Sequence, residues 1–420
     1  MNGSLFIGLT HIGQVYSLGW AKKFGKCAVY DFDDELRDKF KKGDLTNEEP
    51  DLAQAFKQTH DRIITYDNPK KITDHNLIII TMDTPLTQSG EPIVDKVNIF
   101  LEKCILYVRK GATVLLTSQV YCGFCNELKN TVLEDRTDIN FIYWVDTLKM
   151  GVALTRFLNP EQLIFGVEKA SDVPEIFQQF DCPKYFFSYK QAEMVKMGIN
   201  LYLMNSVTFA NSMDNYCREL GFSFATIADS LRQDERIGKK AYISPSLGIS
   251  GGHLERDHST VINTCKDTLT RTMFENMRQI HVERMNVLYR YIDQIIEVKN
   301  IKSILWIGPS YKKESFSLVN SPFMKFVEHY KNKLLVKAYD SSYSIDKINA
   351  VEIIYDLDKE LNKTHHAVFN YGEDEDISTI LNYASNNPET VILDISLPAA
   401  FDVNTPENIH HVLFEQRNIA

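Results

Sequence analysis

The chain has 420 residues, too many for one hydrophobic core, and its length predicts two or three domains. Its 44% hydrophobic and 24% charged residues are ordinary for a globular protein. The net charge of -10 and pI near 5.6 argue against non-specific binding to nucleic acid or anionic membranes. No apolar run reaches membrane-spanning length, and seven scattered cysteines indicate a reducing compartment, so we expect a cytoplasmic protein with no nucleic-acid or membrane partner.

The start of the chain has the pattern of a dinucleotide-binding unit. An apolar strand over 5–8 leads into Gly8-Leu9-Thr10-His11-Ile12-Gly13, an amphipathic helix over 14–24 follows, and a second strand over 28–31 ends in Asp31. Main-chain N–H groups at the start of such a helix can hold a pyrophosphate, helped by the helix dipole. The pattern predicts a cofactor site that comprises Gly8, Thr10, Ile12, Gly13 and Asp31.

Two residues of this turn bear on the cofactor. The Asp31 carboxylate can accept hydrogen bonds from the adenosine ribose and disfavours a 2′-phosphate, and no arginine stands beside it in the sequence. We therefore expect NAD rather than NADP. Thr10 replaces the middle glycine of the pattern, and we expect its Cβ to crowd the approach of the main chain to the pyrophosphate.

Further apolar strands are predicted over 77–81, 113–117 and 141–144, with the clearest helix between them over 94–108. Strands that alternate with helices are typical of a parallel sheet. Asp146 follows the last of these strands. One interpretation of Asp146 is a helix N-cap, a common use of aspartate after a strand.

A long helix is predicted over 192–220, because apolar residues recur there at spacings of three and four without a proline. Lys196 and Asn200 are one turn apart, so both side chains leave the same face. A fixed ammonium and an amide donor can favour an oxyanion. The alternative is a solvated lysine that pairs with Glu193.

The C-terminal part repeats the order strand, turn, helix, strand. After a helix over 268–298, a strand over 303–308, a helix from Ser321-Pro322 to 331 and a strand over 334–339 are predicted. Later strands are predicted over 366–369 and 390–394. The sequence therefore predicts an α/β fold with two Rossmann-like domains joined by a long central helix.

The stretch Gly248-Ile249-Ser250-Gly251-Gly252-His253-Leu254-Glu255-Arg256-Asp257 resembles the active-site loop of the UDP-glucose/GDP-mannose dehydrogenases. In that loop Gly-Gly-Ser/His-Cys is followed four residues later by Asp. The resemblance runs in order from residue 5 to about 402 and includes Thr84-Pro85, Glu193-x-x-Lys196-x-x-x-Asn200 and Asp234-x-Arg236-Ile-Gly. It implies NAD-dependent oxidation of an alcohol of a nucleotide sugar, UDP-linked, in polysaccharide biosynthesis, without a metal.

The resemblance also implies domains and partners. We expect an NAD-binding domain over 1–188, a helical dimerisation and active-site domain over 189–298, and a nucleotide-sugar-binding domain over 299–420. A homodimer or a larger homo-oligomer is expected, because the family's counterpart of Arg236 reaches the sugar nucleotide across a dimer interface. The alternative for Arg236 is a surface arginine paired with Asp234 or Glu235.

Residue roles follow from the same resemblance. Lys196 and Asn200 would lie beside the reacting carbon, and Asp146 would handle water as an acid or base. Cofactor contacts near the nicotinamide and substrate contacts would come from the residues that match the remaining motifs: Thr84, Pro85 and Ser118 for the cofactor, and Tyr242, Gly251, Gly252 and Lys312 for the substrate.

Several positions depart from the family pattern. Met150 replaces the second glutamate, Gln119 replaces a cofactor-contacting threonine, and two ligand-binding arginines of the C-terminal domain are absent. The largest departure is the catalytic cysteine, which holds the intermediate aldehyde covalently in the family. If Asp257 is aligned, His253 takes its place; if Gly251-Gly252-His253 is aligned, Leu254 takes it and His258 takes the place of the aspartate.

An imidazole replaces a thiolate poorly and a leucine cannot replace it at all. The expected function is therefore an NAD-dependent dehydrogenase without the covalent intermediate, in which His253 and Asp257 form an oriented general base. Two alternatives stay open: a catalytically silent protein that binds NAD and a nucleotide sugar, and oxidation of a ring hydroxyl to a ketone.

Overall fold

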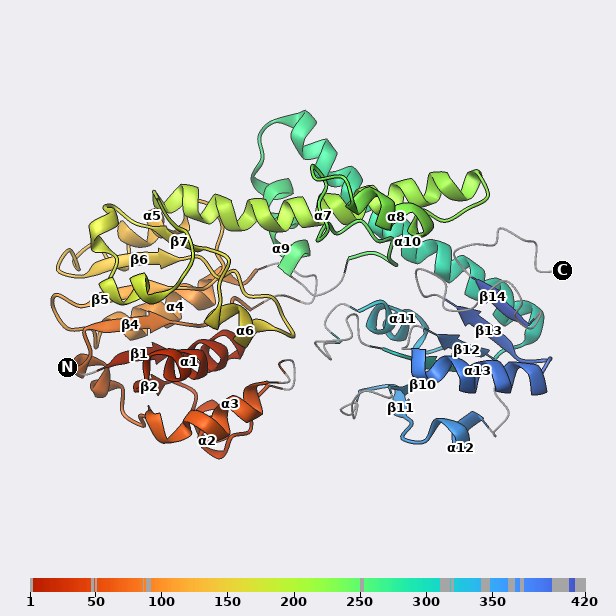
Figure 1. The fold of residues 1–420 in the computed structure, drawn as a ribbon, viewed down its shortest axis with the longest axis horizontal. Coiled ribbons are helices and arrows are strands. Elements are labelled where there is room, and N and C mark those ends of the chain that lie inside the picture. Colours follow the sequence, from red (N-terminus) through yellow and green to blue (C-terminus); the bar gives the residue numbers. More distant parts are fainter. Residues whose placement is uncertain are drawn as a thin grey trace. The chain divides into compact units, whose positions relative to one another are not determined.

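The computed structural model describes residues 3–46, 49, 51–85, 87, 92–249, 253–309, 318, 321–340, 348–361, 367–370, 374–394 and 408–411. The chain divides into two compact units, Met1–Asn200 and Leu201–Ala420, and each contains one sheet with helices packed on it (Figure 1). The predicted α/β class with two Rossmann-like sheets is confirmed. Among the described residues, no helix combines the length and apolarity that crossing a membrane requires.

The sheet of the first unit has eight strands in the order β3-β2-β1-β4-β5-β6-β7-β8. Its first six strands are parallel, and β7 runs antiparallel to β6 and parallel to β8. The order reverses direction between β1 and β4, the switch point at which Rossmann sheets bind nucleotides. The strands are β1 (Ser4–Ile7), β2 (Cys27–Tyr30), β3 (Ile63–Thr65), β4 (Leu77–Ile80), β5 (Thr113–Leu116), β6 (Asn140–Trp144), β7 (Leu163–Gly166) and β8 (Lys184–Phe187).

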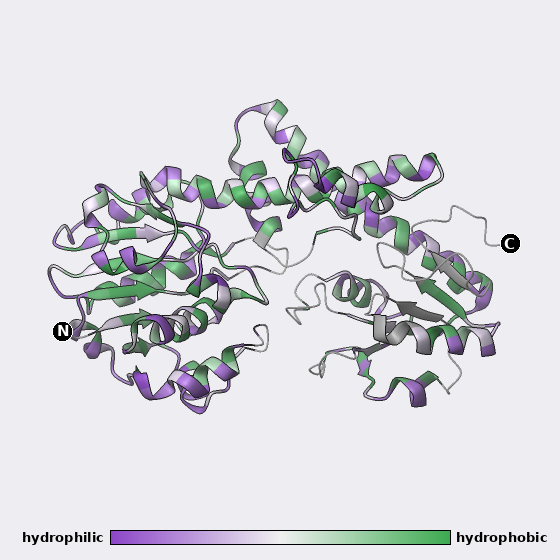
Figure 2. Ribbon diagram, viewed as in Figure 1, coloured by the Kyte–Doolittle hydropathy of each residue, from purple (hydrophilic) through white to green (hydrophobic). Residues whose placement is uncertain are grey.

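Helices cover both faces of this sheet. Leu5 and Ile7 belong to an apolar core with α4, α5 and the start of α7, whereas Phe6 belongs to a second core with α1, α3 and α6. The inner strands are buried on both faces, whereas the edge strands β3 and β8 are partly exposed, and Figure 2 shows the sheet as largely hydrophobic. The helices are α1 (His11–Phe24), α2 (Asp34–Lys42), α3 (Leu52–Thr59), α4 (Val94–Ile105), α5 (Phe124–Lys129) and α6 (Ala153–Leu158).

The sheet of the second unit has six parallel strands in the order β11-β10-β9-β12-β13-β14, which repeats the Rossmann arrangement. Trp306 packs on α11 and the end of α10 on one face, and Leu305 packs on α12 and α13 on the other. The elements are β9 (Ser303–Ile307), β10 (Leu335–Tyr339), β11 (Val351–Ile353), β12 (Ala367–Asn370), β13 (Val391–Asp394), β14 (Ile409–His411), α10 (Thr268–Lys299), α11 (Pro322–Tyr330), α12 (Leu357–Leu361) and α13 (Asp374–Asn386).

Three more helices complete the fold: α7 (Tyr189–Glu219), α8 (Ala225–Arg232) and α9 (His253–Thr264). Helix α7 begins in the first unit and ends in the second. The sequence predicted a loop as far as Asp257, but a helix already begins at His253, so that prediction is wrong for 253–257. The reason is that the helix-breaking glycines end at Gly252, and from Leu254 onwards apolar residues return at helical spacing.

Candidate active site

The glycine turn after β1 is packed closely against the sheet. Gly8 has φ +109°, a conformation that favours glycine, and its N–H donates to Tyr30 O at 2.9 Å. A Cβ on Gly13 would lie 1.8 Å from Gly8 O, so only glycine lets α1 start this near the turn. The last glycine of a dinucleotide-binding turn serves this close packing of helix on strand. The geometry of the turn therefore fits NAD.

Asp31 directly follows β2 and is only 4% exposed. Its carboxylate accepts the N–H of Leu9 at 2.7 Å and of Asp33 at 2.9 Å, and burial raises the pKa of this carboxyl. The expectation that no arginine stands beside Asp31 is wrong in space. Arg37 donates to Asp31 O at 2.5 Å, although its guanidinium also pairs with Asp34.

The Thr10 side chain is directed to the end of β4. Its hydroxyl donates to Thr81 O at 3.3 Å and accepts the N–H of Asp83 at 3.1 Å. Asp83 has no counterpart in the sequence predictions, yet its carboxylate accepts the N–H of Ile12 at 3.2 Å. A negative charge thus lies at the start of α1, where a pyrophosphate is expected.

The motif residues after β4 and β5 hold two neighbouring turns together. Thr84 Oγ1 donates to Gln119 O at 2.5 Å, and Ser118 Oγ donates to Met82 O at 2.6 Å. Pro85 O accepts the N–H of Ile93 at 2.8 Å. Thr84 and Ser118 are buried, so these hydroxyls fix the shape of the cofactor edge of the sheet.

The structure brings Asp146 and Lys196 together. Lys196 Nζ donates to Asp146 O at 2.6 Å and lies 3.6 Å from Asp146 Oδ2. Asp146 Oδ1 accepts the hydroxyl of Tyr16 at 3.2 Å and the N–H of Leu148 at 3.1 Å. The N-cap alternative for Asp146 is wrong, because the next helix, α6, begins only at Ala153. The pair lies at the carboxyl end of β6, the edge of the sheet that carries the glycine turn.

The alternative of a solvated Lys196 paired with Glu193 is also wrong. Lys196 is 8% exposed, and Glu193 instead accepts the N–H groups of Gly123 at 2.6 Å and Cys125 at 2.7 Å. Burial raises the pKa of Glu193. Asn200, one turn after Lys196 on α7, is 7% exposed.

Glu49 is a second buried carboxylate that the sequence did not single out. It accepts the N–H groups of Gly151 at 2.7 Å and Ala153 at 2.9 Å, and lies 3.0 Å from His11 Nε2. These contacts place a carboxylate beside the segment in which Met150 replaces the family's second glutamate. The role of Glu49 could not be predicted from the sequence, because the residues that it contacts lie 38 to 104 positions away in the chain.

The residues that the two alignments place at the family's cysteine and aspartate all lie in helix α9. Leu254 packs against Met204, Ile249 and Met277, and His258 is buried with its Nε2 donating to Phe274 O at 2.7 Å. Burial lowers the pKa of His258. His253 begins the helix, one turn before Asp257, which is 3% exposed with Arg256 Nε at 3.4 Å from its Oδ1.

Two of the residues expected to contact the substrate, Arg236 and Tyr242, lie at the surface. Arg236 is 89% exposed in its side chain and pairs with Asp234 at 2.7 Å, as in the surface alternative, and Tyr242 is 46% exposed. Gly251, Gly252 and Lys312 lie outside the described residues. Within the described ranges, no group of three or more His, Cys, Asp or Glu side chains could hold a metal ion.

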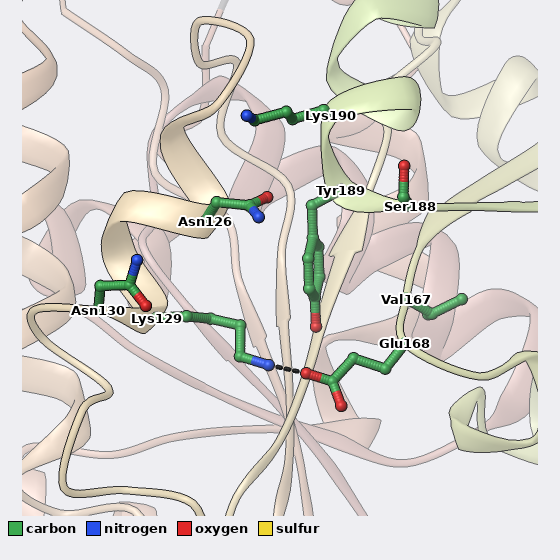
Figure 3. Close-up of a pocket in the computed structure, with 8 residues that line it drawn as sticks. All are labelled: Asn126, Lys129, Asn130, Val167, Glu168, Ser188, Tyr189 and Lys190. Atoms are coloured by element: carbon green, nitrogen blue, oxygen red, sulfur yellow. Dashed lines mark hydrogen bonds and ion pairs between the residues drawn. The ribbon is translucent and has the colours of Figure 1, made fainter.

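A polar hollow of about 530 Å³ lies between α5, the end of β7 and the start of α7 (Figure 3). Lys129 and Glu168 form an ion pair there, near the hydroxyl end of Tyr189. Because β7 and β8 run antiparallel to β6, their carboxyl ends lie at the edge opposite the glycine turn. This hollow is therefore separate from the cofactor edge.

The sheet order, the glycine turn and Asp31 define an α/β protein that binds a dinucleotide. Comparison with protein families is more specific. Residues 4–181 match the NAD-binding domain of the UDP-glucose/GDP-mannose dehydrogenase family, and residues 190–282 match its central domain. The chain belongs to this family and is an NAD-dependent oxidoreductase that acts on a CH–OH group.

Individual relatives are distant in sequence. The chain is 24% identical over 348 residues to a UDP-glucose 6-dehydrogenase of Rickettsia bellii, with 80% of each chain covered. It is 23% identical over 350 residues to UDP-glucose 6-dehydrogenase TuaD of Bacillus subtilis, covering 80% of this chain and 75% of the relative.

Solved structures share the whole fold. A UDP-D-ManNAc dehydrogenase of Pyrococcus horikoshii superposes with a TM-score of 0.82 at 17% identity, covering 98% of this chain and 99% of the other. A UDP-glucose dehydrogenase of Pyrobaculum islandicum gives a TM-score of 0.80 at 16% identity, covering 99% and 98%.

Proposed function

We propose that the protein oxidises an alcohol of a UDP-linked sugar with NAD and does so without a covalent thiol intermediate. The observation that carries this proposal is the buried ammonium of Lys196 beside the Asp146 carboxylate, at the same sheet edge as the glycine turn. Curated relatives with the names of UDP-glucose 6-dehydrogenases support the substrate class. The absence of any cysteine from residues 218–264 is the reason to propose a reaction without the thiol intermediate.

The chain's residues divide the chemistry as follows. Bound NAD would accept a hydride from the alcohol carbon. Lys196 and Asn200 would stabilise the negative charge that develops on the alcohol oxygen, because a desolvated, fixed donor needs no reorganisation. Asp146, held by Tyr16 and Leu148, would position water or accept a proton beside Lys196.

The two cysteines that flank the loop in the sequence, Cys217 and Cys265, are poorly placed to supply a thiol there. All seven cysteines are free, and residues 218–264 contain none. Cys217 is buried in α7, and burial raises the pKa of its thiol. Cys265 follows α9, 12 residues after His253, which corresponds to about 18 Å along a helix. We therefore propose that oxidation ends at an aldehyde or ketone, or reaches the acid slowly through a hydrated aldehyde.

His253 is proposed as the proton acceptor, with Asp257 orienting it. The packing of Leu254 against Met204 and Met277 supports this alignment, since a side chain used in an apolar cluster is unsuited to meet a polar substrate. The hydrogen bond from His258 to Phe274 O likewise gives that residue a structural use.

The product decides this proposal. We expect the His253→Ala variant to bind NAD normally but to lose hydride transfer, because the residue proposed to accept the alcohol proton is removed. Mass spectrometry of the product and a count of NADH per sugar are the measurements. Wild-type protein should give one NADH per sugar in the fast phase. Rapid formation of two NADH, or full activity of His253→Ala, would contradict the account.

A homodimer is proposed as the active unit. Tyr202, Phe209 and Tyr216 recur every seven residues on α7, so they share one face, and they are 67%, 49% and 55% exposed. An exposed aromatic stripe of this length is typical of an association surface. Arg236 would reach the substrate of the second copy.

The dimer can be tested by placing a charge in the stripe. We expect Phe209→Glu to give a monomer in light scattering and to lose activity, because Arg236 would no longer reach a partner's substrate. Ile64→Glu, on an exposed strand of the first unit, is the matched control and should stay dimeric. A fully active monomer would contradict the proposal.

A further inference from the structure

Three side chains from three helices hold the main chain that leads into α9. The first two contacts are at Ser246. Asn211 Oδ1, on α7, accepts the N–H of Ser246 at 2.8 Å, and Arg284 Nε, on α10, donates to Ser246 O at 3.0 Å. Asn211 and Arg284 are 0% and 2% exposed, so these bonds are shielded from water.

The next turn of the same segment has a backbone conformation that favours glycine and lies against α10. Gly248 has φ +122° and lies against α10, where a Cβ would come within 3.5 Å of His281 O. Ser246 Oγ donates to Gly248 O at 2.9 Å. The path of 246–248 is thus determined by contacts with α7 and α10.

The third helix is α11, which belongs to the sheet of the second unit. Its Lys325 Nζ donates to Ile249 O at 2.9 Å and to Glu255 Oε1 at 3.2 Å. In the sequence these two acceptors lie on either side of residues 250–252, and Glu255 is in the first turn of α9. One ammonium therefore ties the segment before the glycines to the helix after them.

We propose that Lys325 is a positioning residue that sets the start of α9 and with it His253 and Asp257. This inference rests on the proposed function, because it assigns these two residues to the reaction. The Lys325–Glu255 pair is about one-third exposed on each side, and pairs of this kind contribute little to stability. A displacement of a catalytic group by about 1 Å, by contrast, can lower the rate by two orders of magnitude.

The test compares variants of the full-length protein. Lys325→Met keeps the stem length and removes the ammonium; we expect kcat to fall about tenfold or more, with NAD binding unchanged and Tm close to wild type. Lys325→Arg should restore most of the rate, because it keeps a cation with several donors. Glu255→Gln should lose about two- to threefold, since the bond to Ile249 O remains.

Lys331→Met is the matched control. Lys331 follows the same helix and pairs with Glu328 in an exposed position, so its loss should leave kcat unchanged. Wild-type kcat in Lys325→Met, or a fall in Tm large enough to explain the lost rate, would overturn the proposal.

Hydrogen exchange separates this inference from the proposed function. Amides of 246–257 should exchange faster in Lys325→Met than in wild type and in Lys331→Met. If wild-type protein oxidises no nucleotide sugar, the proposed function fails. Faster exchange of 246–257 in Lys325→Met would still support the inference that Lys325 positions this segment. If these amides exchange in Lys325→Met at the wild-type rate, the inference about Lys325 is overturned, whatever the activity of the variant.

Discussion

Three buried carboxylates of the first unit and three side-chain donors of the second unit hold main chain with opposite chemistry. In the first unit, buried carboxylates accept main-chain N–H groups: Asp31 from Leu9 and Asp33, Glu49 from Gly151 and Ala153, and Glu193 from Gly123 and Cys125. In the second unit, side-chain donors bind main-chain carbonyls: Arg284 to Ser246, His258 to Phe274 and Lys325 to Ile249.

This difference sets how each unit responds to acid. Burial raises the pKa of Asp31 and Glu193, so the folded first unit accepts protons on these groups more readily than the unfolded chain does. Their contribution to the free energy of unfolding is lost as pH rises, not as it falls. Burial lowers the pKa of His258 and His281, whose contribution is lost as pH falls below 6.5. The two histidines should therefore make the second unit lose stability as the pH falls below 6.5.

The largest expected effect is at Arg284, which donates to both Asp214 and Ser246. Arg284→Met removes one partner of a buried ion pair and should cost about 3–5 kcal/mol of unfolding free energy. Denaturant unfolding is the measurement. Arg290→Met, on the same helix in an exposed pair with Glu283, is the control and should change little. Equal losses of unfolding free energy in both variants would show that the buried contacts of Arg284 stabilise the fold no more than the exposed pair of Arg290 does.

The next effect is the acid response of His281. Burial, assisted by the cations of Lys325 and Arg284, lowers its pKa from 6.5 to about 4. A shift of this size corresponds to about 3 kcal/mol of unfolding free energy lost between pH 7 and pH 4. His281→Gln can still bond Thr208 and does not titrate, so its stability should vary less with pH over this range. If the stability of His281→Gln varies with pH as that of the wild type does, His281 does not contribute to the acid sensitivity of the second unit.

The smallest effect concerns Asp83 in the first unit. Its carboxylate lies at the start of α1, and it opposes an anionic pyrophosphate there. Asp83→Asn can still accept the Ile12 N–H, and NAD should bind about two- to fivefold more tightly by calorimetry. The exposed Asp61→Asn is the control. Weaker binding in Asp83→Asn would mean that the carboxylate supports the turn instead of opposing the cofactor.

Local pattern was enough to predict most of the regular structure. The glycine turn, its strand and α1 follow from apolar runs and from Gly8 and Gly13, whose roles are fixed by their own backbone. The start of α9 was predicted wrongly, because Gly251-Gly252 favours a loop while the apolar spacing from Leu254 favours a helix. Packing of Leu254 with Met204 decides it, and that contact spans 50 residues.

The parts of the site that lie within short sequence motifs were predictable. The contacts between residues far apart in the sequence were not. Lys196 could be proposed from its spacing to Asn200, but its bond to Asp146 required the sheet to be assembled. Glu49, Asp83 and Arg37 act only through such long-range contacts, so no local pattern marks them.

Helix α7 has a consequence for how the chain is made. It is a single helix of 31 residues, and the boundary between the two compact units falls inside it, after Asn200. During synthesis the first unit can complete its sheet before α7 is finished, since N-terminal parts fold first. Lys196 reaches Asp146 only once α7 has grown past it, so the cofactor edge of a nascent chain should mature later than the sheet that carries it.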